Sequence, residues 1–139
     1  NPQISYGEDI IARCNMAVAS PEGRAQLQKL ATDAISDLGN SMAQSVGASA
    51  QDIVEVVVVG NTAMHHLCLG LPVRQLALAP FVPAVSSELD IKARDLGIDI
   101  APGAYVHLLP NIAGFVGADH VSMLLATEAR TARGAVVAL

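Results

Sequence analysis

Polar side chains stand just beyond two stretches of the sequence that read as buried strands. Asn61 and Thr62 follow the apolar run 56–60, and Asn111 follows the apolar run 104–109. In open α/β sheets, ligands bind in the crevice beyond the carboxyl ends of the strands. These three side chains are therefore candidates for contact with a ligand.

Two further candidates open the next predicted helix. Gly117 permits close packing of the backbone, and Asp119 lies in the first turn, where a carboxylate can orient water or Mg²⁺. A carboxylate at this position is also stabilised by the helix dipole, and Asn61 is also a good N-cap for its own helix. Both interpretations stay open for each residue, and no catalytic role is assigned to any of them.

The sequence lacks the motifs of several other common binding sites and active sites. The sequence contains no GxGxxG, no GxxxxGK[ST], no HExxH and no GxSxG. His65 and His66 are adjacent, so they point about 100° apart on a helix and cannot chelate a metal as i, i+4 histidines do. We expect helix-surface or hydrogen-bonded core histidines and no metal site. Cys14 and Cys68 form no CxxC and are expected to be buried free thiols in a reducing cytoplasm.

The elements that position the candidates are predicted from a change of hydrophobic period. Four valines at 56–59 are apolar on both faces, which predicts a strand over 52–59 buried on both sides in a parallel sheet. Apolar residues then recur at helical spacing, which predicts a helix over 61–69 ended by Gly70. A second strand over 104–109 ends in Pro110-Asn111, much as the first ends in Gly60-Asn61. The two loops are expected to face one crevice.

The remaining pattern completes an α/β protein of parallel strands covered by helices. Ser20 and Pro21 separate two helices, and Gly39-Asn40 weakens the second near its middle. The other expected elements are a helix over 7–19, a long helix ending near Gly47, an extended segment at 79–83, a short helix within 86–96, a helix after Gly117 carrying Val121, Leu124, Leu125 and Ala129, and a strand-like run at 135–139.

The composition of the chain limits the classes of partner that it is expected to bind. The 139 residues are 52% hydrophobic but only 3% aromatic, so the core must be aliphatic. The net charge is −5 with no basic run, which argues against a nucleic-acid partner. No apolar run approaches the roughly 18 residues of a membrane span, so we expect a cytoplasmic protein. The start at Asn1 without methionine and the strand-like end predict a single excised fragment, with a helical part at 1–50 and an α/β part at 51–139.

Four segments together resemble a known family. They are NPQISYGEDIIAR at 1–13, VVVVGNTAMHHLCLGLP at 56–72, LALAPFVP at 76–83 and LLPNIAGFVGADH at 108–120. These segments resemble the C-terminal, actin-like ATPase region of reductive activators of corrinoid-dependent enzymes. That region is related to the sugar kinase, heat-shock ATPase and actin superfamily (ASKHA), with a ribonuclease H-like fold, and the superfamily's helical insertion would correspond to 7–47.

The resemblance implies a function for a longer parent chain. In such activators a [2Fe–2S] ferredoxin domain reduces the cob(II)amide of a partner corrinoid protein, and ATP with Mg²⁺ drives the reduction. The Asp-x-Gly-Thr phosphate loops of the superfamily and the cluster cysteines do not occur within 1–139. We therefore expect no cofactor in the fragment itself, which would lie between the two phosphate loops.

Two alternatives remain. The parent is either an activator or small-molecule kinase of another class in the same superfamily, or the chain is a non-catalytic interaction module. A CxxxxCxxC run upstream would favour the ferredoxin-linked activator, and a phosphate loop just past Leu139 would argue against the interaction module. An uncovered sheet edge also predicts that the fragment forms a homodimer.

Overall fold

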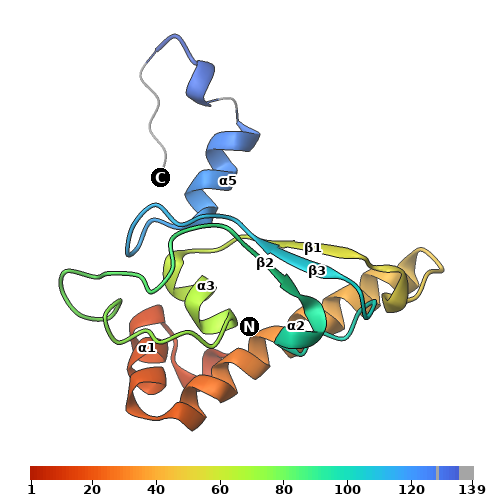
Figure 1. Cartoon of the computed structure of the whole chain (residues 1–139), viewed down its shortest axis with the longest axis horizontal. Coiled ribbons are helices and arrows are strands. Elements are labelled where there is room, and N and C mark those ends of the chain that lie inside the picture. The colour runs from red at the N-terminus through yellow and green to blue at the C-terminus, as the bar shows by residue number, and fades with distance from the viewer. Residues whose placement is uncertain (128, 135–139) are drawn as a thin grey trace.

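The first helices begin at capping side chains. The computed structural model describes residues 1–127 and 129–134 (Figure 1). Helix α1 spans Ile10–Ala19, and the Asp9 carboxylate accepts a hydrogen bond from the Ala12 N–H at 2.7 Å. Helix α2 spans Pro21–Ser45, and the Ser20 hydroxyl oxygen accepts from the Gly23 N–H at 2.8 Å. The predicted start at Ser20-Pro21 is confirmed, and α2 continues without a break through Gly39-Asn40.

The strands form one small mixed sheet. Strand β1 spans Glu55–Val58, β2 spans Leu89–Lys92 and β3 spans Tyr105–Leu108, in the order β1-β3-β2. Strand β1 is parallel to β3, with Glu55 opposite Tyr105, whereas β2 is antiparallel to β3. The remaining elements are η1 (Ile4–Tyr6), η2 (Ala50–Asp52), α3 (Thr62–Cys68), α4 (Ala93–Leu96), α5 (Ala118–Ala126) and η3 (Ala129–Thr131).

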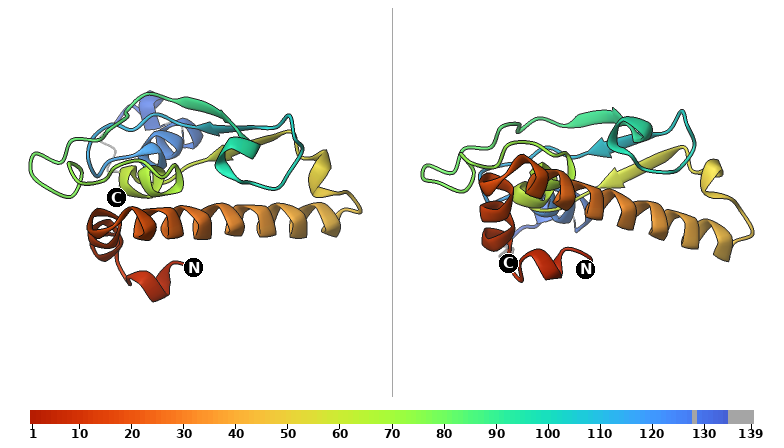
Figure 2. Two further views of the ribbon diagram at one scale, coloured as in Figure 1. Left: turned by 60° about the horizontal axis from the view of Figure 1, so that its bottom comes forward. Right: turned by 90° about the horizontal axis from the view of Figure 1, so that it is seen from below.

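Helices cover one face of this sheet. Figure 2 shows α2 running along the molecule below the sheet, with α3 between them and α1 folded back at one end. One apolar cluster joins α1, α2 and α3, and it includes the fully buried Leu27 and Leu67. A second cluster lies under the sheet and includes Val106 and Leu108. Both cores are mainly aliphatic, as the composition predicts.

Two predictions about the segments between the strands are wrong. The predicted short helix within 86–96 is strand β2 followed by the single turn of α4, because Leu89 and Ile91 alternate with polar residues and pair with β3. The predicted extended segment at 79–83 begins inside a turn, which is closed by the Phe81 N–H donating to the Leu78 carbonyl at 2.7 Å. Because β2 runs antiparallel to β3, the sheet is not purely parallel.

Several apolar residues are more exposed than predicted. Strand β1 is not buried on both faces, because the helices cover only one face of the sheet, and Val57 on the other face is 58% exposed. The helical spacing of Leu38, Met42 and Val46 predicts one covered face of α2, but these three residues are 63–79% exposed. On α5, Leu125 is 70% exposed, and Ala129 lies beyond the end of the helix.

Some expectations lie outside this description. The strand-like run 135–139 lies outside the described residues. Within 1–127 and 129–134, each helix is too short or too polar to cross a bilayer.

Candidate functional site

The two asparagine loops are neighbours, as the sequence predicts. Strands β1 and β3 pair side by side in the same direction, so their carboxyl ends lie at one edge of the sheet. Asn61 follows β1 and is the N-cap of α3, where its Oδ1 accepts from the Met64 N–H at 2.9 Å. Asn111 follows β3 and is only 6% exposed. The sheet thus brings both residues to its carboxyl edge.

Thr62 ties these two loops together. Its side chain is fully buried, and its hydroxyl donates to the carbonyl oxygen of Ala113 at 2.6 Å. Ala113 belongs to the loop that leaves β3 and leads into α5. The Thr62 side chain is therefore engaged in joining the loops.

Gly117 and Asp119 lie against the loop that follows β1. A Cβ added at Gly117 would lie 2.5 Å from the Thr62 backbone nitrogen and 2.7 Å from the Gly60 carbonyl oxygen. The Asp119 N–H donates to the same Gly60 carbonyl at 3.2 Å. The start of α5 therefore packs directly on the start of α3, which requires glycine at 117.

The Asp119 carboxylate remains accessible. Its side chain is 45% exposed, and its Oδ1 accepts from the His120 backbone N–H at 2.9 Å. The His120 imidazole lies 3.6 Å from the same oxygen. Helix-terminal stabilisation and contact with a ligand both remain compatible with this geometry.

The side chain of Asn111 is buried without a partner. Its backbone N–H donates to the Ser86 carbonyl at 2.9 Å, but neither Oδ1 nor Nδ2 has a hydrogen-bond partner among the described residues. An unsatisfied buried polar group costs about 1–3 kcal/mol, so such groups are rare and commonly mark contacts with water or ligand. Asn111 is the candidate whose geometry points most directly to a partner from outside the described residues.

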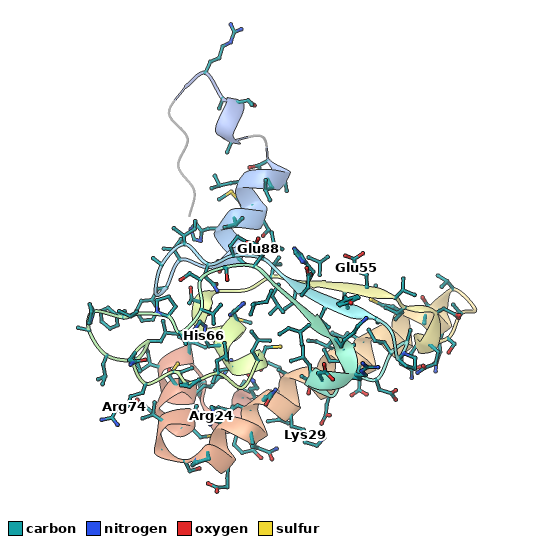
Figure 3. The ribbon with its side chains drawn as sticks, in the orientation of Figure 1. Arg24, Lys29, Glu55, His66, Arg74 and Glu88 are labelled. Carbon is teal, nitrogen blue, oxygen red and sulfur yellow. The ribbon has the colours of Figure 1, made fainter. Side chains whose placement is uncertain are left out.

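His65 and His66 lie in the core, which is one of the two environments that the sequence left open for them. Both rings are almost fully buried, whereas Met64, whose helical spacing with Leu67 and Cys68 predicts a buried position, is 48% exposed. Figure 3 shows His66 in the interior and Arg74 at the periphery. His66 matches the predicted hydrogen-bonded core histidine, because its Nδ1 lies 2.7 Å from the Thr62 carbonyl and its Nε2 accepts from the Ala84 N–H at 2.9 Å. The only available signal was the spacing of four residues from Thr62 to His66.

These contacts determine the proton position on the His66 ring. A carbonyl oxygen only accepts, so His66 carries its proton on Nδ1. The Nδ1 of His65 lies 3.4 Å from that nitrogen, whose proton is already donated to the Thr62 carbonyl. The Nε2 of His65 is buried and has no hydrogen-bond partner among the described residues.

The free energy of unfolding is expected to decrease as the pH falls below 6.5, because of His65 and His66. Burial, and then the charge of His66, lower the pKa of His65 from 6.5 to about 4, and burial also lowers the pKa of His66. The unfolded chain therefore takes up protons first as the pH falls, and His65 alone should remove about 2 kcal/mol of unfolding free energy by pH 5. Urea unfolding at pH 7.5 and pH 5 measures this loss. A His65→Gln variant that loses as much stability as the parent chain would contradict it.

Comparison with known proteins decides the family. A profile of the RACo middle region matches residues 1–132. The chain belongs to the RACo middle region family. The corrinoid activation enzyme RamQ of Eubacterium limosum is 31% identical over 125 residues, which cover 90% of this chain and 21% of RamQ. The solved structure of a reductive activator for corrinoid, iron-sulfur protein matches 96% of this chain with a TM-score of 0.90 and 31% identity.

These relatives are much longer than the chain. This RACo middle region spans about a fifth of RamQ and 21% of the solved activator. The resemblance to reductive activators of corrinoid-dependent enzymes is confirmed. The mixed α/β fold, with its small sheet and covering helices, is similar to the corresponding part of the solved activator.

Proposed function

We propose that the chain is the middle part of an ATP-dependent reductive activator and forms one wall of its nucleotide cleft. The observation that carries this proposal is the meeting of two asparagine loops at the carboxyl edge of parallel strands β1 and β3. An actin-like ATPase fold, with phosphate loops outside residues 1–139, follows from the resemblance. The partner would be a corrinoid protein, whose cob(II)amide takes up one electron.

The residues present fit part of an ATP·Mg²⁺ site. Asn111 offers an unsatisfied amide and Asp119 an accessible carboxylate, which are groups that bind phosphate-bound Mg²⁺ or its water ligands. They do not fit a [2Fe–2S] cluster, which needs four thiolates or equivalent ligands. The two cysteines of the chain are buried free thiols, and burial raises the pKa of both. The cluster therefore belongs to another part of the longer protein.

The alternatives remain those of the same superfamily. An activator of another enzyme class or a small-molecule kinase would share the cleft wall, and a non-catalytic interaction module would share only the fold. RamQ is described as a corrinoid activation enzyme, which favours the corrinoid activator. A CxxxxCxxC motif upstream in the longer protein is the discriminating observation.

The 139-residue chain alone is expected to fold without binding ATP at micromolar concentration. The sequence contains the packed helices and strands but neither phosphate loop, so most contacts to the triphosphate are missing. Calorimetric titration with Mg·ATP checks this expectation, and the full-length protein serves as the positive control. Micromolar binding by the isolated chain would show that residues 1–139 do not lie between the loops.

The isolated chain is also expected to self-associate. Strand β1 is at the edge of the sheet, and its exposed Val57 and Val59 favour pairing with another edge. Sedimentation at increasing protein concentration should therefore detect a dimer or a larger species. A single monomeric species at high concentration would contradict this expectation.

A further inference from the structure

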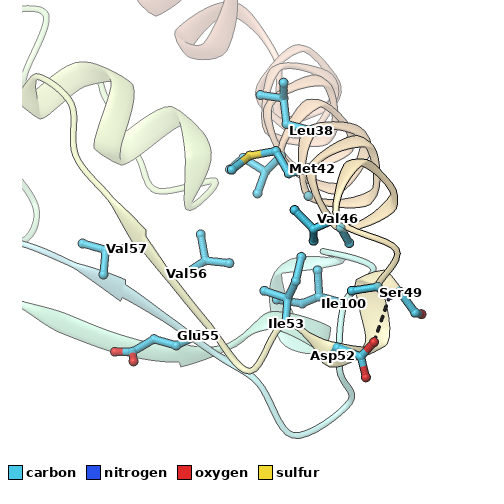
Figure 4. A pocket seen from close by; sticks show the side chains of 14 residues that line it. Leu38, Met42, Val46, Ser49, Asp52, Ile53, Glu55, Val56, Val57 and Ile100 are labelled. Atoms are coloured by element: carbon cyan, nitrogen blue, oxygen red, sulfur yellow. Dashed lines mark hydrogen bonds between the residues drawn. The ribbon is translucent and has the colours of Figure 1, made fainter.

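Exposed apolar side chains gather at two prominent places among the described residues. The first is a groove of about 650 Å³ between the second half of α2 and strand β1, with a mainly aliphatic lining (Figure 4). Leu38, Met42 and Val46 of α2 face this groove. Aliphatic side chains of this kind are typical of protein cores. The second place has a different composition and is formed by loops.

The second place is a patch that we call the phenylalanine face. Two loops form it, residues 75–87 between α3 and β2 and residues 109–117 between β3 and α5. Its large apolar side chains are each 41–58% exposed, and they are Leu78, Phe81, Val82, Ile112 and Phe115. The chain has only two phenylalanines, and both belong to this face.

The two loops of the phenylalanine face are held against each other. The rings of Phe81 and Phe115 are in contact, with centroids 5.2 Å apart and planes tilted by 60°. Gly114 lies against the backbone of Phe81, and a Cβ at Gly114 would collide with the Phe81 carbonyl oxygen. The Ala113 N–H donates to the Val116 carbonyl at 2.9 Å, which closes the second loop. The face is therefore preformed, so binding to it costs little conformational entropy.

Phe81 has a backbone conformation that large side chains rarely adopt. Its φ is +60°, the one positive value among the non-glycine residues that the structure describes. Such conformations are unfavourable for a bulky residue, and they cluster at binding sites and switch regions. Here the Phe81 ring lies at the surface against Phe115, and not in a core. Core packing therefore does not account for this conformation.

The two loops carry no charged side chain. Residues 75–87 and 109–117 contain no Asp, Glu, Lys, Arg or His. Nucleic acids and acidic lipid headgroups are bound through basic side chains, which this face lacks. The centres of protein–protein interfaces, in contrast, are depleted of charged residues and enriched in aromatic ones. The composition of the phenylalanine face fits the apolar surface of another protein.

The phenylalanine face is continuous with the candidate nucleotide site. Its second loop joins Asn111 to the start of α5, where Asp119 lies. Within this loop, the Ala113 carbonyl accepts the 2.6 Å hydrogen bond from the Thr62 hydroxyl. A shift of the loop after β1 on nucleotide binding would therefore reach the backbone beside Phe115.

We infer that the phenylalanine face is the surface on which the corrinoid protein docks, with Phe81 and Phe115 as the anchors that enter an apolar part of that partner. The inference rests on the proposed function, in which the longer activator binds a corrinoid protein, reduces it and releases it. Five side chains are few for a permanent interface, whereas redox partners that meet transiently use small interfaces. Docking beside the nucleotide site places the partner where ATP can affect its binding.

Calorimetric titration of full-length activator variants with the corrinoid protein, in its cob(II)amide state, tests this inference. Phe81→Asn removes one ring, and asparagine tolerates a positive φ, so the melting temperature should stay near that of the parent protein. Phe115→Ser removes the other ring. Each change should raise the Kd about tenfold or more, as expected for the loss of an aromatic anchor. The matched control is Ile11→Gln, because Ile11 is 47% exposed on α1 outside both loops, and its Kd should not change.

The outcomes of this titration separate the inference from the proposed function. Unchanged Kd values in Phe81→Asn and Phe115→Ser would overturn the inference and leave the proposed function standing. An equal rise of the Kd in Ile11→Gln would also overturn the inference alone. A parent activator that binds no corrinoid protein would overturn both.

Hydroxyl-radical labelling of the two rings identifies what covers the phenylalanine face. In the dilute, free full-length activator both rings should be labelled, and the corrinoid protein should suppress their labelling but not that of Tyr105, which is 47% exposed on β3. Rings that stay unlabelled in the dilute free activator would be covered by its own chain. Labelling that falls with activator concentration would indicate a second copy, and labelling that falls with phosphatidylcholine vesicles would indicate a membrane. Each of these three results would overturn the inference.

Discussion

Replacing Asn61 by aspartate in the full-length activator is expected to lower ATP turnover by about tenfold or more while the fold stays intact. Aspartate is as good an N-cap as asparagine, so it can keep the 2.9 Å hydrogen bond from the Met64 N–H. It also adds a negative charge at the edge of the sheet where the triphosphate is proposed to bind. Two like charges about 7 Å apart at an effective dielectric constant of about 20 repel by about 2 kcal/mol.

Two companion variants separate the charge from the cap. Asn61→Ser keeps a capping oxygen without a charge, so it should turn over ATP nearly normally. Asn61→Ala loses the cap and should cost about 0.5–2 kcal/mol of unfolding free energy. ATP turnover and corrinoid reduction are measured beside thermal stability for all three variants. Normal turnover in Asn61→Asp would leave Asn61 as a helix cap and remove it from the cleft.

Local signals in the sequence predicted the helix ends well. The Ser20-Pro21 start of α2 was predictable because capping and a fixed proline φ act within a few residues. Gly70 ends α3 at φ +64°, with the Leu71 N–H donating to the His66 carbonyl at 2.9 Å. Such ends depend on adjacent residues alone, so one sequence is enough to find them.

Tertiary pairing decided the elements that the sequence did not predict. The segment 89–92 alternates apolar and polar residues over only four positions, and a helix ending at Gly97 fits the same letters. Pairing with β3 favours the strand, and that contact spans many residues along the chain. The four valines of 56–59 likewise predict a strand, but they do not indicate whether another strand pairs with its outer edge.

The position of the candidate site was predictable in part, because it depends on where two strands end. Asn61 and Asn111 share a position at strand ends, and a parallel pair places such positions side by side. The contact of Gly117 with Gly60 and Thr62 depends on how α5 packs, and neither this contact nor the missing partners of Asn111 could be predicted from spacing. The sequence could not decide between surface and core for the two histidines, because an adjacent polar pair interrupts the apolar stripe of α3.

The close approach of α5 to α3 gives Gly117→Ala a large expected effect on stability. The added methyl group would meet backbone atoms at 2.5 Å and 2.7 Å, and backbone cannot move aside as the end of a flexible side chain can. We expect a loss of about 3 kcal/mol of unfolding free energy, at the upper end of the usual cost of overpacking. Urea unfolding of the 139-residue chain at pH 7.5 measures this loss.

Gly103→Ala is the matched control, because no atom lies within 4 Å of its added Cβ and its φ lies outside the left-handed region. Its stability should therefore stay within about 0.5 kcal/mol of the parent chain. In the full-length activator, Gly117→Ala should also impair ATP turnover, since the Asp119 N–H donates to Gly60 and both move when the two helix starts separate. If Gly117→Ala proves as stable as Gly103→Ala, the strand-end loops can separate without cost. The joined site of Asn61, Thr62 and Asp119 would then lose its structural basis.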